Sequence, residues 1–334
     1  MYQGPYQGPA NKPDRKEETK PVEPKKVQVP TKLVHTIDCG QGAVRAVRFN
    51  TDGNYCMTCG NDKSIKLWNP TTQMLIKKYT GHGYDVLDAA GSNDNCQIAS
   101  CGSDKSVMYW DVGSGQIIRR FRGHVGRVNC VEFNEESTVI LSGSVDASIR
   151  CWDCRSRKHT PIQVIDDAKD SVSSIQVTDH EILTGSIDGK VRRYDLRTGA
   201  LHSDYVGSAI TCVKFTKDGQ CTLSSAHDNS VRLLDVTTGE LLGEYKGHKN
   251  SKYMVECCLS IKDDHVISGS EDGSIYIWDL IDATVKYKLQ VRSNRTVHSL
   301  SHHPEQNLLM VACEDKVHLY SGEDFELPDV EMSE

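Results

Sequence analysis

The sequence predicts an all-β fold made of seven repeats, and two regularities carry that prediction. An aspartate recurs in a turn at intervals of 42, 42, 42, 40, 44 and 43 residues. These aspartates are Asp62, Asp104, Asp146, Asp188, Asp228, Asp272 and Asp315. In most copies a serine or threonine stands four residues before the aspartate, and a large apolar residue, usually aromatic, follows six residues after it. Repeats of about 40–45 residues with Gly-His and Trp-Asp marks are typical of propeller blades. We therefore expect a seven-bladed β-propeller of four-stranded antiparallel blades.

Residues 1–30 are expected to form a disordered, proline-rich tail. They hold six of the ten prolines and little apolar pattern, so they bury too little surface to offset the entropy lost on ordering. Within this tail, Lys25–Val29 has the pattern basic-basic-apolar-x-apolar, which is similar to the docking motifs that mitogen-activated protein kinases bind.

Residues 31–321 are expected to form the propeller, followed by a disordered acidic tail at 322–334 with six acids and no base. The segment Lys32–Ile37 alternates like a strand but has no neighbouring strand in sequence. Each repeat then supplies an inner strand, such as Val128–Phe133, a second strand ending at the hydroxyl residue and a third ending at the aromatic residue. An outer strand, such as Gln116–Arg122, completes the blade. The last repeat lacks an outer strand after Tyr320.

Over residues 31–321 these marks resemble the WD-repeat family. In that family the N-terminal strand completes the last blade and closes the ring, which leaves no open end to the propeller. The resemblance therefore implies that Lys32–Ile37 lies beside Val317–Tyr320.

The resemblance also implies a buried relay of hydrogen bonds in which aspartate accepts from histidine, histidine meets a hydroxyl, and the hydroxyl accepts from an indole. Three repeats carry the full set: His82, Ser100, Asp104 and Trp110; His124, Ser142, Asp146 and Trp152; and His248, Ser268, Asp272 and Trp278. Three equivalent sets at equal intervals indicate structure, because hydrolytic catalysis needs one nucleophile, an oxyanion hole and a cleft. The other four repeats lack the histidine, with Gln41 and Ser208 in its place in the first and fifth, and are expected to be looser.

Composition excludes several classes of function. The net charge is −7, of which the acidic tail supplies −6, so the propeller offers no basic stripe and no direct nucleic-acid binding is expected. No apolar run reaches the ~20 residues of a membrane span, and no leader is apparent. The thirteen cysteines are scattered along strands, which predicts reduced thiols in a reducing compartment.

Other short motifs do not predict a chemical site. Cys56 and Cys59 have the spacing of a metal pair, but residues three apart on a strand point to opposite faces. Cys151 and Cys154 bracket the Trp-Asp of another repeat. The segment 185–190 is one residue too short for a phosphate-binding loop. We expect no metal, no cofactor and no enzymatic activity.

The loops at one rim of the ring are the predicted partner-binding site. They combine arginines, tyrosines and apolar turn tips, which are frequent anchors of protein interfaces. The candidate residues are Arg45, Tyr84, Asp85, Arg127, Val145, Ile187, His227, Tyr253, Glu271 and Arg295. In addition, Trp152–Arg155 matches the Trp-Asp-x-Arg box of WD-repeat receptors of cullin-type ubiquitin ligases, which makes Arg155 a candidate ligase-adaptor contact.

Longer segments, such as 38–50, 179–199 and 218–250, resemble WD-repeat scaffolds of mitogen-activated protein kinase (ERK) cascades that also associate with spliceosomes. That resemblance implies a non-enzymatic adaptor for several protein partners, monomeric within larger complexes, in the cytoplasm and nucleus. A spliceosome-associated component in pre-mRNA splicing and a substrate receptor of a cullin-type ligase remain the alternatives.

Overall fold

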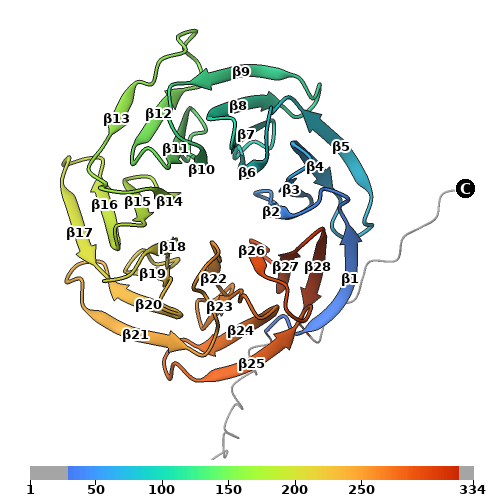
Figure 1. The fold of residues 1–334 in the computed structure, drawn as a ribbon, viewed down its shortest axis with the longest axis vertical. Helices are drawn as coiled ribbons and strands as arrows, with labels where there is room; N and C mark the ends of the chain where they lie inside the picture. The colour runs from blue at the N-terminus through green and yellow to red at the C-terminus, as the bar shows by residue number, and fades with distance from the viewer. Residues whose placement is uncertain (1–28, 323–334) are drawn as a thin grey trace, which may run out of the picture.

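The computed structural model describes residues 29–322, which form seven four-stranded antiparallel sheets around a central axis (Figure 1). Within this range every regular element is a β-strand. The predicted all-β, seven-bladed propeller is therefore confirmed. The predicted tails lie outside the described residues except at their inner ends, and Val29 and Pro30, assigned to the N-terminal tail, are buried.

Each blade runs from an inner strand at the axis to an outer strand at the periphery. The inner strands are β2 (Val44–Phe49), β6 (Val86–Gly91), β10 (Val128–Phe133), β14 (Val172–Val177), β18 (Ile210–Phe215), β22 (Cys257–Leu259) and β26 (Val297–His302). The second strands are β3 (Cys56–Gly60), β7 (Gln97–Gly102), β11 (Val139–Ser144), β15 (Glu181–Ser186), β19 (Cys221–Ala226), β23 (His265–Ser268) and β27 (Leu308–Cys313).

The third strands are β4 (Ser64–Trp68), β8 (Ser106–Asp111), β12 (Ile149–Asp153), β16 (Lys190–Asp195), β20 (Ser230–Asp235), β24 (Ser274–Asp279) and β28 (Lys316–Ser321). The outer strands are β5 (Leu75–Thr80), β9 (Ile117–Arg122), β13 (Gln163–Ile165), β17 (Leu201–Tyr205), β21 (Leu241–Lys246), β25 (Val285–Gln290) and β1 (Lys32–Asp38). Blades one to six are numbered in chain order from β2, and blade seven contains β26, β27, β28 and β1.

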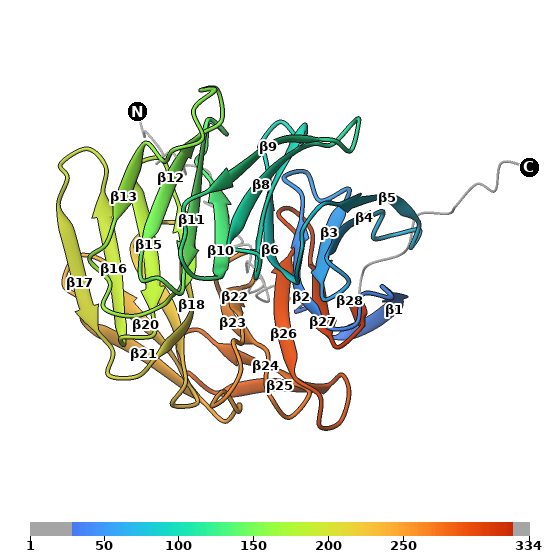
Figure 2. The same ribbon diagram turned by 45° about the horizontal axis from the view of Figure 1, so that its top comes forward.

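Neighbouring blades face each other around the ring (Figure 2), and the clusters of buried apolar side chains combine residues of adjacent blades. The middle strands are covered on both faces, so β3 and β27 are buried at every position and show no alternation. Trp152 of blade three illustrates the packing: it stacks on Phe121 of blade two with ring centroids 5.2 Å apart. Burial of such rings, together with the aliphatic side chains around them, stabilises the packing of neighbouring sheets.

The ring closes through β1, as the sequence predicts. This strand pairs antiparallel with β28, in a register that runs from Lys32 opposite Ser321 to Asp38 opposite Lys316. A β-bulge lies between Leu33 and His35. The two ends of the chain thus share one sheet, and the closure leaves blade seven complete.

Candidate functional site

The buried relay predicted from sequence forms in blades two and three. In blade two, the Trp110 indole donates to Ser100 Oγ (2.8 Å), and His82 lies 2.8 Å from Ser100 Oγ and 2.9 Å from Asp104 Oδ2. A carboxylate only accepts, so His82 Nδ1 donates to Asp104 and its Nε2 accepts from the hydroxyl. Burial raises the pKa of Asp104, but the hydrogen bond and charge of His82 outweigh it and lower the pKa.

Blade three repeats this arrangement with Trp152, Ser142, His124 and Asp146 at 2.8–3.0 Å. Burial lowers the pKa of His124, so its ring is neutral at pH 7. The side chain of His124 is 1% exposed, as is that of His82. No substrate reaches either ring, which supports a structural role for these residues.

In blade six the predicted relay does not form. Both ring nitrogens of His248 are buried without a hydrogen-bond partner among the described residues. The physical reason is Tyr276, which stands where blade two has Met108: its hydroxyl donates to Asp272 (3.0 Å) and its ring stacks on Trp278. The indole of Trp278 donates instead to the carbonyl of Lys246 (3.0 Å).

Blade one forms a relay that the sequence analysis missed. The amide oxygen of Gln41 accepts from Thr58 Oγ1 (2.5 Å), which accepts in turn from the Trp68 indole (2.9 Å). Gln41 Nε2 donates to Asp62 (3.2 Å) and to the carbonyl of Ser64 (2.9 Å). A primary amide has one acceptor and one donor end, so it replaces a neutral imidazole in this position.

Blades four and five hold their turn aspartates by ion pairs. Arg192 pairs with Asp188 and Arg232 with Asp228, each at 2.6 Å. Both arginines stand four residues after the aspartate, at the position of Tyr276 in blade six. In blades four, five and six the side chain at this position therefore supplies a partner for the turn aspartate.

Five predicted rim residues meet at one cavity. Arg45, Asp85, Arg127, His227 and Tyr253 line a space of about 360 Å³ at the central channel. Tyr253 is 50% exposed. Arginine and tyrosine side chains, which are frequent anchors of protein interfaces, gather here together with the carboxylate of Asp85.

The other predicted rim residues have different surroundings. Tyr84 is 64% exposed, with the Lys63 ammonium 5.6 Å from its ring centroid, whereas Arg295 is engaged by Glu314 (2.7 Å). Glu271 accepts the backbone N–H groups of residues 251–253, so it positions the Tyr253 loop.

Apolar residues at the rim differ in how far they are exposed. Val145 is exposed as predicted, while Ile187 is half-buried. Sequence reasoning missed Val125, which is 73% exposed, and Met254, which also lines the cavity. Val125 directly follows the relay residue His124, and this position in the sequence was the one signal that could have placed it in a rim loop.

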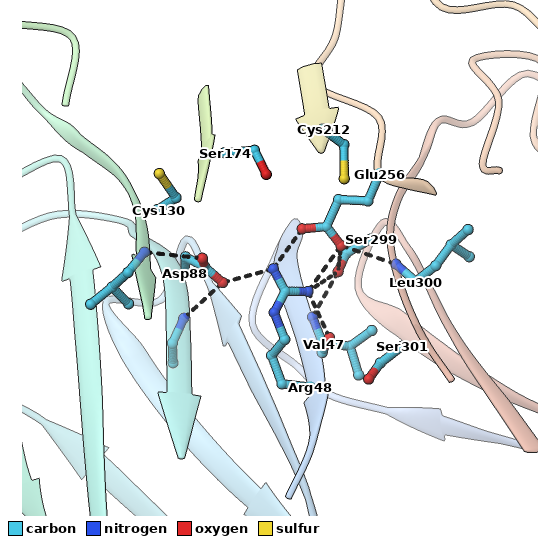
Figure 3. A network of polar contacts seen from close by, with 12 residues as sticks. Val47, Arg48, Asp88, Cys130, Ser174, Cys212, Glu256, Ser299, Leu300 and Ser301 are labelled. Carbon is cyan, nitrogen blue, oxygen red and sulfur yellow. Dashed lines mark hydrogen bonds and ion pairs between the residues drawn. The ribbon is translucent and has the colours of Figure 1, made fainter. Parts of the chain in front are cut away.

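Below this rim a polar network ties the inner strands together (Figure 3). The Arg48 guanidinium contacts Asp88 of blade two (2.8 Å) and Glu256 of blade six (2.6 Å), and it donates to Ser299 of blade seven (3.0 Å). Burial acts to raise the pKa of Glu256, but the charge and hydrogen bonds of Arg48 lower it overall. For Asp88, burial outweighs Arg48 and the pKa is raised.

Side chains of this kind also accept hydrogen bonds from backbone N–H groups at the inner edge of a sheet, which have no neighbouring strand to pair with. Backbone N–H groups on inner strands donate to polar side chains of a neighbouring blade: Val47 to Ser299 (3.0 Å), Val131 to Asp88 (3.2 Å) and Val213 to Ser174 (3.2 Å). Unpaired backbone groups at a strand edge otherwise need water or a partner. The network in the channel is therefore structural and fixes adjacent blades to each other.

The described residues contain neither a disulfide nor a cluster of metal-ligating side chains. All thirteen cysteines are free thiols, and residues 29–322 contain no cluster of three or more side chains suited to a metal ion. In the same range no helix has the length and apolar character needed to cross a membrane.

Comparison with known proteins agrees with the fold. Residues 31–69 match the family model "WD domain, G-beta repeat", and residues 86–263 match "Nucleolar protein 10-like, N-terminal domain". The chain is 63% identical over 303 residues to WD repeat domain-containing protein 83 of Rattus norvegicus, covering 91% of this chain and 96% of that protein. The chain belongs to the WD-repeat family.

Other relatives extend the same similarity. WD repeat domain-containing protein 83 of Homo sapiens is 63% identical, with 92% of this chain and 97% of that protein covered. The Dictyostelium discoideum homolog of that protein is 36% identical, with 82% and 93% covered. WD-repeat propellers are in general non-enzymatic interaction proteins, and the rim described above is consistent with a scaffold or adaptor.

Proposed function

We propose that this protein is a scaffold that assembles members of a mitogen-activated protein kinase (ERK) cascade, with partners bound at the rim. The observation that carries the proposal is the cavity lined by Arg45, Arg127 and Tyr253, beside the exposed Tyr84 and Val125. Aromatic and arginine side chains with apolar neighbours provide most of the binding energy in protein interfaces. The resemblance of the long segments to kinase-cascade scaffolds supports the choice of partner.

The rim is a better kinase-binding candidate than the N-terminal motif at residues 25–29. Val29, the last apolar residue of that motif, is 6% exposed and packs with Ile267, Leu309 and Tyr320 between blades six and seven. A linear docking motif needs its apolar residues free to enter a groove on the kinase. Residues 25–28 lie outside the described part of the chain, and the buried Val29 favours binding through the rim.

Two alternative functions are tested by the experiment described below. A nuclear location takes some support from the match to a nucleolar protein 10-like domain, and a role in pre-mRNA splicing stays an alternative. A role as a ubiquitin-ligase receptor depends on Arg155, which is exposed. We propose both cytoplasmic and nuclear locations for the chain.

The test is quantitative mass spectrometry of proteins that co-purify with the tagged full-length chain, compared with the double variant Arg127→Glu/Tyr253→Ala. Matched controls are Lys262→Glu and Tyr287→Ala, which make similar changes at exposed positions of blade six. We expect the rim variant to lose at least about fivefold in recovered cascade kinases, about 1 kcal/mol, and the controls to lose none.

Recovery of splicing proteins without kinases would replace the signalling role with the splicing role. Recovery of a cullin adaptor that disappears with Arg155→Ala would support the ligase role instead. Equal kinase recovery by the rim variant and the wild type would refute binding at the rim.

A further inference from the structure

Blade three departs from the other blades at its outer edge. Its outer strand β13 has three residues, whereas the outer strands of the other six blades have five to seven. The loop that precedes β13 spans residues 154–162, nine residues, compared with five or six in the corresponding loops of blades one, two, four, five and six. This loop stands out from the ring at the top of Figure 1.

The short strand leaves part of the sheet edge open. In blades one, two and six, the tryptophan at the end of the third strand pairs with the first residues of the outer strand, as Trp110 does with Ile117. In blade three, β13 pairs only with Ile149–Cys151 of β12, so Trp152 has no outer partner strand. An outer edge of this kind can accept an additional extended strand.

The loop is also unusually basic. Residues 154–162 include Arg155, Arg157 and Lys158 and no acid, whereas each of the corresponding loops carries at most one charged residue. All three side chains are exposed. Arg157 and Lys158 form no ion pair with any residue in the range 29–322. The guanidinium of Arg119 in blade two holds the base of the loop by donating to the carbonyls of residues 153, 154 and 156.

Protection of an edge strand does not account for these charges. Proteins discourage edge-to-edge pairing by placing charges on the edge strand itself. Here β13, Gln163–Ile165, carries no charge, and the bases lie in the loop beside it. Next to them, Ile162 at the end of the loop and Val164 in β13 are 60% and 45% exposed. This exposed edge therefore carries three basic side chains in the loop, followed by the exposed apolar side chains of Ile162 and Val164.

We propose that this edge, residues 154–165, is a second docking surface that binds an extended acidic peptide segment of a partner protein. Carboxylates of the segment would contact Arg155, Arg157 and Lys158, and its apolar side chains would pack on Ile162 and Val164. The segment would extend the sheet beside β13. A peptide fits better than single-stranded RNA, because residues 154–165 include no Phe, Tyr or Trp for base stacking.

A second surface away from the rim deepens the proposed scaffold function, because a scaffold must hold two partners at once. Its test does not depend on the kinase assignment. Fluorescence anisotropy would measure binding of a fluorescein-labelled decapeptide of alternating Glu and Val to the full chain, at low and at physiological salt. A decapeptide of alternating Lys and Val, and a dodecamer of uridine, are the comparison probes.

We expect the Glu/Val peptide to bind and the Lys/Val peptide not to bind. Arg157→Glu/Lys158→Glu should weaken binding by about tenfold or more, equal to about 1.4 kcal/mol. Ile162→Ser should weaken it about threefold at physiological salt, where exposed charges are partly screened. The controls Lys262→Glu in blade six and Arg127→Glu at the rim should change the affinity by less than about twofold, and all variants should keep the wild-type melting temperature.

Three results would overturn the proposal. The first is no measurable binding of the Glu/Val peptide to the wild type. The second is an equal loss with Lys262→Glu, which would show that only overall charge matters. The third is tighter binding of the uridine dodecamer that the double variant abolishes, which would make the edge an RNA-binding surface.

Discussion

Replacement of Gln41 by alanine tests whether an amide truly takes the place of histidine in the relay of blade one. Gln41 is fully buried, and its side chain is the acceptor for the Thr58 hydroxyl and a donor to the Ser64 carbonyl. Alanine would leave both groups without these partners in the core. Each buried polar group that loses its partner costs about 1–3 kcal/mol.

The expected loss in the free energy of unfolding is therefore about 2–5 kcal/mol for Gln41→Ala. Gln41→His should cost less than about 1 kcal/mol, because an imidazole accepts from the hydroxyl and donates to Asp62 as His82 does with Asp104. Equilibrium urea unfolding, followed by tryptophan fluorescence, measures both values, since Trp68 belongs to the same relay.

The reasoning would be refuted if Gln41→Ala cost less than about 0.5 kcal/mol. It would also be refuted if Gln41→His destabilised the protein as much as Gln41→Ala, because the site would then require the shape of glutamine and not its donor and acceptor.

Three further predictions follow from the closure and the relays. Deletion of residues 31–38 should lower the thermal midpoint by more than about 5 °C, since it removes the strand that pairs with β28, whereas deletion of 1–28 should change it by about 1 °C or less. Asp146→Ala should destabilise the protein more than Asp272→Ala in urea unfolding. The first change leaves the buried imidazole of His124 without its acceptor, whereas Asp272 interacts partly with the half-exposed Lys288. Burial lowers the pKa of His248 to about 4, so only the unfolded chain takes up its proton between pH 6.5 and 4. The free energy of unfolding should therefore fall by up to about 3 kcal/mol as the pH falls through this window, and level off below it. His248→Leu should remove this contribution. If urea unfolding of the variant showed the same pH dependence as the wild type, the prediction would be contradicted.

The spacing of the repeats was sufficient to predict the fold because each blade restates the same local pattern. Turn aspartates, hydroxyl residues and aromatic residues all stand at fixed offsets. The segment Lys32–Ile37 has no partner strand next to it in the sequence, and it pairs with β28 of the last blade. The closure followed from the WD-repeat resemblance and from the absence of an outer strand after Tyr320.

The relays could be predicted only in part, because a motif records residue types and not the competition for hydrogen bonds. Blade six has all four relay residues, yet Tyr276 takes the carboxylate of Asp272. Blade one lacks the histidine, yet Gln41 supplies an equivalent donor and acceptor. In both blades one side chain outside the motif, or one substitution within it, decides which hydrogen bonds form.

The rim was predicted as a region more reliably than residue by residue. Five of the ten predicted residues line one cavity, but whether a side chain in a loop is free depends on its neighbours in other blades. Glu271 accepts hydrogen bonds from backbone amides and Arg295 forms an ion pair with Glu314, so neither is free, whereas Val125 is exposed. The open edge of blade three depends in the same way on pairing between strands, which the sequence shows only as a longer loop.

The most direct test of the scaffold function is the mass of the complex formed by this chain with a mitogen-activated protein kinase and its upstream kinase. Size-exclusion chromatography with light scattering measures that mass for each pair and for the three proteins together. The account predicts one species whose mass equals the sum of all three chains. Binary complexes only, with the two kinases displacing each other, would contradict it.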